Sequence, residues 1–600
     1  AYNIAIGNDA GYNVTTGTQN TIVGGLAGDA LTTGANNIAI GYAALSADQT
    51  GHGSVAIGPF ALEDQDGGNL YNVAVGFSAG QDITSGGYNT LVGADAGDAL
   101  TTGGYNVAIG TGALSAEDAN GYNIAIGNNA LVAQNAGADA YNVAIGYIAG
   151  QAISTGVRNV LIGGHAGDNI TTGAYNIAIG YHALGTEDAH GFNVAIGYAA
   201  LSTQDAGADA YNTAVGYYSG VALTTGVLNT LIGGLAGDAL TTGSYNVAIG
   251  VEALGTEDTY GKNTAIGYAA LNALNAGADG YNTAVGYNTG VAMTTGQSNV
   301  CIGGEAGKAL TSSSANVAIG RNALMTEDTE GLAVAVGHSA LKLQNATAAT
   351  YNVAVGYYAG AEVTTGAGNT LIGGQAGDSL TTGGFNTAVG KSALSTEDAH
   401  GYCTAVGYQA LLTQDAGADA ANTAVGFDTG GDITTGIRNT LMGHEAGKTL
   451  TTGGYNVAIG YHALTTEDAH GRNVAIGYRA LANQDAGADG YNVAMGYNAG
   501  AEITTGANNT IIGALAGDAL NTGAYNVAVG QGALSMETAH GKNVAIGRSA
   551  LETLNAGADS YNVAVGFNTG TGITTGAENV LVGGNAGDAL TTGAYNVAIG

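Results

Sequence analysis

The sequence has one proline, no tryptophan, six phenylalanines and two cysteines in 600 residues. A chain of this length ordinarily forms several domains, and their cores are ordinarily rich in aromatic side chains. Because Phe and Trp are so scarce, we expect instead a thin aliphatic core that is repeated many times. A repeat protein tolerates such a core because each repeat contacts only its neighbours.

Cationic side chains are also scarce, at 12 Lys and Arg against 46 Asp and Glu, and the net charge is −34. Phosphate groups are bound by clustered cations, so this balance argues against nucleic acid as a partner and against adsorption to anionic lipid. Gly, Asn and Asp interrupt every apolar run, so we expect no membrane insertion by this segment. The acidic surface is expected to keep the particle soluble.

What the sequence has in abundance is one five-residue motif, which recurs from Asn3-Ile-Ala-Ile-Gly7 to Asn596-Val-Ala-Ile-Gly600 in about 35 copies. Every copy ends in Gly, and Ile, Val or Met precedes that Gly. The opening Asn is replaced only by Ser54, Ala333 and Cys403. A repeat of this kind decides the architecture before any local pattern does.

The spacing of the motif predicts a β-solenoid. The start of the motif advances in steps of 17, 17, 17 and 19, and these four coils form a 70-residue super-repeat, as between Asn142 and Asn212. The third coil carries Thr-Glu-Asp-Ala-His-Gly at 186–191, and the fourth carries Gln-Asp-Ala-Gly-Ala-Asp-Ala at 204–210. A unit of this length is too short for a helical hairpin or a propeller blade, but it suits one solenoid coil. We therefore expect an all-β, parallel β-solenoid of about 35 such coils.

The motif alternates aliphatic and small residues, as a half-buried strand does. We expect the aliphatic positions to line the interior of the coil, and the closing Gly to form a corner that no other residue tolerates. A second short strand is expected over 182–184. The predicted interior positions are Ile109, Ile145, Ile179 and Val215, with Val107 or Thr213 on the same face.

The opening asparagines are expected to stack from coil to coil in a ladder of side-chain amides. We expect this ladder at Asn72, Asn89, Asn106, Asn123, Asn142, Asn159, Asn176 and Asn193.

Candidate chemical sites are few. The histidines at the equivalent positions 190, 400, 470 and 540 belong to coils too far apart to share a metal ion. The pairs Glu187 and Asp188, Glu257 and Asp258, and Glu397 and Asp398 are interpreted as solvated turns. Repeated Asp beside Gly, as in the Ala-Gly-Asp-Ala-Leu turns, suggests calcium, but Lys308 and Lys448 replace that Asp in two copies. We expect no catalysis, cofactor or metal site, although ion binding at the acidic turns stays open.

The two cysteines, Cys301 and Cys403, belong to distant coils. About six coils separate them, or roughly 29 Å at the strand spacing of parallel sheets, so they cannot form a disulfide within one chain.

At the level of the whole repeat, Asn-Val-Ala-Ile-Gly followed by Tyr-x-Ala-Leu resembles the head repeat of YadA-like trimeric autotransporter adhesins. The form at 212–217, Asn-Thr-Ala-Val-Gly-Tyr, is also similar to repeats of phage tail fibres. The resemblance covers the whole chain and implies a left-handed parallel β-roll with three chains side by side, on a cell surface, outside the cell or in a virion fibre. The family's coil is usually shorter, so we expect wider turns here.

The third motif position is predicted to face the partner chains of this homotrimer. It is Ala in most coils and Leu in the second coil, where the residue after the motif Gly is small rather than Tyr. Such compensation suggests one shared space between chains. The predicted interface residues are Leu91, Leu161, Leu231, Leu371, Leu441 and Leu581.

We interpret 1–600 as a single continuous solenoid segment, uncapped at both ends and part of a longer chain, because solenoids need caps over their open edges. Its expected function is that of a structural fibre that spaces or displays other domains. The alternative is an adhesin whose Tyr-rich sides bind a host or matrix surface, since aromatic side chains favour binding surfaces.

Overall fold

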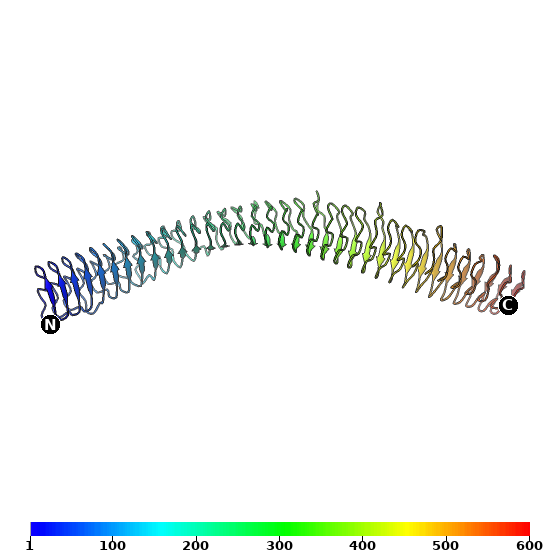
Figure 1. Ribbon diagram of the computed structural model, residues 1–600, viewed down its shortest axis with the longest axis horizontal. Helices are drawn as coiled ribbons and strands as arrows, with labels where there is room; N and C mark the ends of the chain where they lie inside the picture. The colour runs from blue at the N-terminus through cyan, green and yellow to red at the C-terminus, as the bar shows by residue number, and fades with distance from the viewer. Residues whose placement is uncertain (1) are drawn as a thin grey trace. The chain divides into compact units, whose positions relative to one another are not determined.

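The computed structural model describes residues 2–600 and divides into two compact units, 1–298 and 299–600. Residues 2–600 contain strands and turns but no helix (Figure 1). Each unit is a parallel β-solenoid, and the units together hold 35 strands, so the expected fold class and coil number are confirmed.

Every strand has three residues and comprises the second, third and fourth positions of the motif. The strands of the first unit are β1 (Ile4–Ile6), β2 (Thr21–Val23), β3 (Ile38–Ile40), β4 (Val55–Ile57), β5 (Val73–Val75), β6 (Thr90–Val92), β7 (Val107–Ile109), β8 (Ile124–Ile126), β9 (Val143–Ile145), β10 (Val160–Ile162), β11 (Ile177–Ile179), β12 (Val194–Ile196), β13 (Thr213–Val215), β14 (Thr230–Ile232), β15 (Val247–Ile249), β16 (Thr264–Ile266) and β17 (Thr283–Val285).

The second unit repeats this arrangement. Its strands are β18 (Val300–Ile302), β19 (Val317–Ile319), β20 (Val334–Val336), β21 (Val353–Val355), β22 (Thr370–Ile372), β23 (Thr387–Val389), β24 (Thr404–Val406), β25 (Thr423–Val425), β26 (Thr440–Met442), β27 (Val457–Ile459), β28 (Val474–Ile476), β29 (Val493–Met495), β30 (Thr510–Ile512), β31 (Val527–Val529), β32 (Val544–Ile546), β33 (Val563–Val565), β34 (Val580–Val582) and β35 (Val597–Ile599).

Within each unit, every strand pairs in parallel with the strand of the next coil, and equivalent motif positions lie opposite each other. Leu161 of β10, for example, lies between Ala144 of β9 and Ala178 of β11. This register follows from the repeat, because a slip of one residue would turn every side chain to the other face of the sheet.

The closing glycine of the motif forms the corner that the sequence predicts. Gly146 has φ +146°, and a Cβ built on it would lie 2.3 Å from the carbonyl oxygen of Gly163 in the next coil. An L-residue is excluded there both by the backbone conformation and by the approach of the neighbouring coil.

The predicted phase of the strand is wrong. From β2 to β34 the third motif position, usually Ala or Leu, is buried in the interior, whereas the second and fourth positions are half-buried or exposed. Ile109 is 36% exposed, and Ile145, Ile179 and Val215 are half-buried. The coil is narrow and also receives side chains from its turns, so its interior has room for Ala at this position.

The expected second strand at 182–184 is also absent. Both His182 and Leu184 have positive φ, 58° and 52°, so this segment is a turn. It still bonds to the neighbouring coils, because the Leu184 N–H donates to the Ala200 carbonyl at 2.9 Å. Leu184 is fully buried and, with Ala183, supplies the interior volume that the strand leaves open.

The search of residues 2–600 for membrane-spanning segments finds no helix long and apolar enough to cross a bilayer.

Candidate functional site: asparagine ladder and acidic turns

The opening asparagines form a buried column along each unit. The Oδ1 of Asn159 accepts the backbone N–H of Asn176 at 2.9 Å, and its Nδ2 donates to the carbonyl of Gly173 at 2.9 Å. Each side chain thus binds the strand entrance of the next coil and the turn that leads to it. The same backbone bond to the next coil is made by Asn72, Asn89, Asn106, Asn123, Asn142, Asn159, Asn176 and Asn193.

The ladder differs from the expected one in its partner group. Its common bond joins a side-chain oxygen to a backbone N–H, while direct amide–amide bonds occur at a few positions, such as Asn229 to Asn212 at 3.2 Å. Backbone donors at the interior must be paired, and this arrangement pairs one in each coil that follows a ladder asparagine. Ala333 and Cys403 still donate their own N–H groups to Asn316 and Asn386, but they offer no side-chain amide to the coil that follows.

The six leucines predicted at a trimer interface lie instead inside their own chain. Leu91, Leu161, Leu231, Leu371, Leu441 and Leu581 have no exposed surface. A side chain that is already enclosed by its own coil cannot contact another chain, so this assignment is corrected.

The large Leu is compensated by small residues, but these are glycines of its own chain and not the position that Tyr occupies in other coils. A Cβ on Gly150 or on Gly167 would lie 2.7 or 2.8 Å from a methyl group of Leu161, so Leu161 fills the room that these glycines leave. Tyr181, which occupies the position after the motif Gly, is 46% exposed and lies on the outside. Leu and Tyr therefore do not share one space.

The interpretation of the Glu-Asp pairs as solvated turns is wrong for their glutamates. Glu187, Glu257 and Glu397 have no exposed surface. The equivalent position of the preceding coil holds a buried aliphatic residue. Ile170, for example, is the equivalent of Glu187. Burial disfavours the charged carboxylate and raises the pKa of Glu187 to about 7.

Three of these turns gather a histidine and further carboxylates around the buried glutamate. Glu187 lies beside His190 of its own turn, with Nδ1 and Oε1 3.6 Å apart, and one ligand atom each of Glu187, Asp188, His190 and Asp205 lies within 4.8 Å of the others. Asp205 belongs to the next coil. The sequence analysis compared histidines of distant coils with one another and so missed this group. The Glu-x-x-His spacing, together with the aspartate at the equivalent turn of the following coil, could have indicated it.

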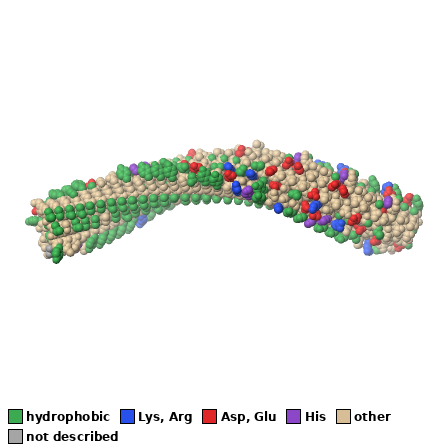
Figure 2. All heavy atoms as spheres, in the orientation of Figure 1, with side chains coloured by type: hydrophobic (Ala, Val, Ile, Leu, Met, Phe, Trp, Pro, Cys, Tyr) green, Lys and Arg blue, Asp and Glu red, His purple; other side chains and the backbone are tan. Residues whose placement is uncertain are grey.

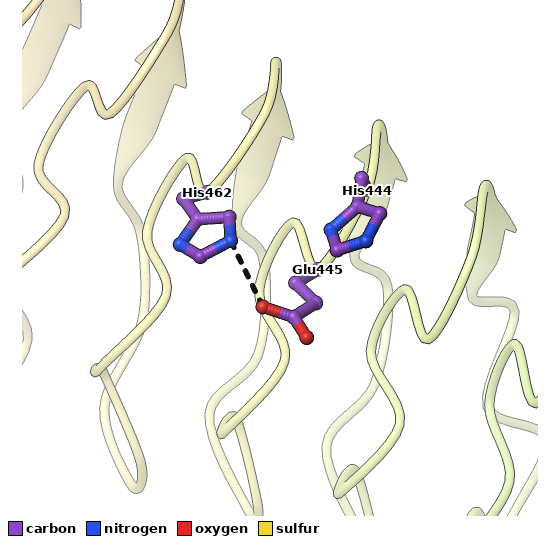
Figure 3. Close-up of side chains that lie close together, drawn as sticks. All are labelled: His444, Glu445 and His462. Carbon is purple, nitrogen blue, oxygen red and sulfur yellow. Dashed lines mark ion pairs between the residues drawn. The ribbon is translucent and has the colours of Figure 1, made fainter.

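A fourth cluster joins His444, Glu445 and His462 near β26 and β27 (Figure 3). The Nε2 of His462 lies 2.9 Å from Glu445 Oε2, and Lys448 Nζ lies 3.1 Å from Oε1 of the same carboxylate. The Lys448 ammonium holds the pKa of Glu445 below its usual range. The two imidazoles are nearly parallel, at 10°, so their in-plane lone pairs do not converge on one ion. In the structure this cluster is held together by the contacts of Glu445 with His462 and Lys448.

Tyrosines form stacked columns on the outside of the first unit. The rings of Tyr88, Tyr105, Tyr122 and Tyr141 follow one another at 4.9–5.1 Å and are close to parallel. A surface hollow of about 340 Å³ runs beside this column and also touches Asp139. Stacking between coils therefore accounts for the tyrosine positions, and the hollow gives the column a concave side.

Both cysteines are free and buried, and the missing disulfide agrees with their separation in the sequence. Burial raises the pKa of Cys301 and of Cys403 to about 12, so both stay thiols at neutral pH.

Comparison of the chain with protein-family models, with curated protein sequences and with solved structures finds no match.

Proposed function

We propose that this segment is the shaft of an extracellular fibre, in which three copies associate side by side as left-handed β-rolls and space or display other domains. One observation carries the proposal. The fourth position of the strand is Ile, Val or Met and faces outward in every coil, so each unit carries a continuous apolar strip beside its buried column, and the outward second position widens it where it is Val or Ile rather than Thr.

The strip is a contiguous apolar surface and not a set of isolated hydrophobic residues. Ile109 and Ile232 are 36% and 37% exposed, and equivalent residues of neighbouring coils lie one strand spacing away. Continuous rows of hydrophobic side chains are visible along the N-terminal unit in Figure 2. Large contiguous apolar patches on soluble proteins mark association surfaces, and a repeated strip is complementary to the same strip on another copy.

The 70-residue super-repeat fits this proposal. If three chains associate in parallel, equivalent coils lie at the same height along the fibre. The four-coil period of one chain then matches the period of its two partners. The resemblance of the motif to YadA-like heads and to phage tail fibres supports the trimer and the extracellular location. The net charge of −34 keeps neighbouring fibres apart by repulsion.

The molar mass in solution tests the proposal. Light scattering should give three times the 58.5 kDa of one chain, and Ile109→Glu together with Ile232→Glu should shift the mass to that of the monomer. Thr102→Glu together with Thr242→Glu, which adds the same charge at two exposed turns, serves as the matched control and should leave the trimer intact. A monomeric wild-type chain, or a trimer unaffected by both Ile substitutions, would overturn it.

The hollow beside the stacked tyrosines favours a second candidate function, that of an adhesin. Exposed aromatic side chains next to a carboxylate suit sugar or peptide ligands of a host or matrix surface. Tyr105→Ala and Tyr122→Ala should then reduce binding to a matrix-coated surface while the molar mass stays unchanged. Undiminished binding by these variants would exclude the tyrosine column as the adhesive surface.

A further inference from the structure

Three acidic turns combine a buried glutamate, a histidine and carboxylates in one small space. The three clusters are Glu187, Asp188, His190 and Asp205; Glu397, Asp398, His400 and Asp415; and Glu467, Asp468 and His470. In each cluster, one ligand atom of every member lies within 4.8 Å of the others. The distance from His Nδ1 to Glu Oε1 is 3.6, 3.5 and 3.9 Å in turn.

These clusters contain buried polar atoms that form no hydrogen bond in the described part of the chain, although the backbone N–H groups of Ala206, Ala416 and Ala486 lie close enough to the three glutamate carboxylates to lower their pKa. Glu187, Glu397 and Glu467 have no exposed surface, yet the Oε2 of each lacks a hydrogen-bond partner among residues 2–600. The buried Nδ1 atoms of His190, His400 and His470 lack one as well, as does that of His540, so the unpaired glutamate oxygen is what distinguishes the three clusters from the turn of His540. Unpaired polar atoms are costly inside a protein, so their concentration in one place indicates a missing ligand.

Equivalent turns without the full set of ligands satisfy the same oxygen internally. Glu257 Oε2 accepts the backbone N–H of Ala276 at 3.2 Å, and Glu327 Oε2 accepts the side-chain amide of Gln344 at 2.9 Å. Glu537 Oε2 accepts the N–H of Ala556 at 3.1 Å. Glu117 is the exception, because its Oε2 is unpaired although Asn120 replaces the histidine.

The histidine and the aspartate of the next coil occur together within the sequence. His190, His400 and His470 are followed at one fixed spacing by Asp205, Asp415 and Asp485, whereas Asn120, Tyr260 and Glu330 are followed at that spacing by Asn135, Asn275 and Asn345. Two copies depart from this pairing: His540 stands with Thr538 and Asn555, and the first copy has Gly51 in place of the histidine but still has Asp66. The carboxylate thus appears in the three turns where the imidazole and a complete Glu-Asp pair are present.

We propose that each of these three turns binds one transition-metal dication of the zinc type, and that in the first two turns the ion lies between two successive coils, because Asp205 and Asp415 belong to those clusters. Imidazole nitrogen and carboxylate oxygens are the ligands of such ions, and calcium, which prefers oxygen alone, is disfavoured. Two ligands of a tetrahedral zinc ion lie roughly 3.4 Å apart, given bond lengths of about 2.1 Å. The Glu–His separations are near this value, and the exposed Asp188 and Asp205 leave an entry path from solvent.

The functional consequence is a metal link between neighbouring coils, which adds to the hydrogen-bond ladder. The ion would pair the buried Glu187 carboxylate and hold the turn of one coil to Asp205 of the next. A ligand that binds only the folded state stabilises it, so Zn²⁺ should raise the thermal unfolding temperature. This proposal does not depend on the number of chains in the fibre.

The test is a titration of the full chain, stripped with chelator, with Zn²⁺ and separately with Ca²⁺. Calorimetry and elemental analysis should give about three Zn²⁺ per chain, one for each cluster, and no comparable Ca²⁺ binding. His190→Asn combined with His400→Asn and His470→Asn should abolish these sites, because Asn occupies the same position at Asn120 without a metal-ligand set.

His540→Asn is the matched control, since it removes a histidine of the same coil position that lacks both added aspartates. It should leave the zinc stoichiometry unchanged, and circular dichroism should confirm that all variants fold. X-ray absorption should show one nitrogen ligand per zinc with oxygens completing the shell. Absence of zinc binding by the wild-type chain, or binding that survives the triple variant and is lost with His444→Asn and His462→Asn, would overturn the proposal. Neither result would affect the molar-mass test of the trimer.

Discussion

At the scale of single residues, two motif positions have requirements that other side chains do not meet. The opening Asn offers an oxygen to the next coil and an N–H group to the following turn, both from a buried position. The closing Gly adopts a backbone conformation that is closed to L-residues and lies against the next coil. The near-invariance of both positions within the sequence therefore has a direct structural cause.

Removing one ladder asparagine should be costly. Asn159→Ala leaves the N–H of Asn176 and the carbonyl of Gly173 unpaired in the interior. We expect a loss of about 2–4 kcal/mol in unfolding free energy, from the cost of two unsatisfied buried groups. Native-state hydrogen exchange at the Asn176 amide measures the effect. The exposed Asn128→Ala is the control, and equal protection of the Asn176 amide in both variants would contradict the role of the ladder.

The corner glycine should tolerate no side chain. Gly146→Ala places a Cβ 2.3 Å from the Gly163 carbonyl oxygen and forces an L-residue to φ +146°. We expect a cost of about 3 kcal/mol or more, from strain and the clash together. Urea unfolding measures it against Gly68→Ala, where a Cβ meets nothing within 4 Å. Equal stability of the two variants would show that the corner can relax.

At the scale of elements, each strand is only three residues long, and each strand from β2 to β34 buries only its middle residue. The rest of the core comes from the turns, in which Ala183 and Leu184 are buried. The side chains of a strand and of its turns fill one narrow interior together. A large side chain from the strand therefore requires small residues in the turns. Leu161 beside Gly150 and Gly167 is an example of this exchange.

The strand phase can be tested within one strand, β14. Leu231→Ala removes a side chain with no exposed surface and should cost about 2–5 kcal/mol through the cavity that it leaves. Ile232→Ala changes the next residue, which is 37% exposed, and should cost clearly less in the isolated chain. Chemical denaturation of the two variants gives the comparison. If Ile232→Ala lowered the unfolding free energy of a monomeric preparation more than Leu231→Ala, the second and fourth motif positions would be the interior ones.

At the scale of the whole molecule, the net negative charge and the buried carboxyl groups both make the folded chain more stable at lower pH. The chain has a net charge of −34, and burial raises the pKa of glutamates in successive acidic turns, among them Glu117, Glu257 and Glu327. A carboxyl group whose folded-state pKa is raised stabilises the fold when it is protonated. That stabilisation is fully present below the ordinary pKa and is lost as the pH rises through the folded-state value.

The unfolding temperature should therefore rise as the pH falls from about 8 to about 5. Glu117→Gln isolates the contribution of one buried carboxyl group, since the amide oxygen can still accept the Asn120 N–H. This variant should be more stable than the wild type at neutral pH, and the difference should shrink as the pH falls toward 4.5, the ordinary value. Parallel pH profiles for the two proteins would show that Glu117 is not protonated preferentially in the folded chain.

The period of the repeat predicts the fold without further help. Few structures other than a parallel solenoid have a repeat of this short length with alternating aliphatic and small positions. The corner role of Gly146 and the stacking of Asn159 follow from the same recurrence, because residues that repeat at the coil period must lie above one another.

The sequence by itself determined the solenoid, the strand at the five-residue motif and the asparagine column, because these depend only on which residues recur. The tertiary structure decided which face of the strand is inside. Hydrophobicity favours Ile109 for the interior, but the volume already filled by turn residues admits only Ala108. It also decided that Glu187 is buried and that Asp205 approaches it from the next coil. Such placements depend on how the turns pack against one another, and a linear pattern does not contain that information.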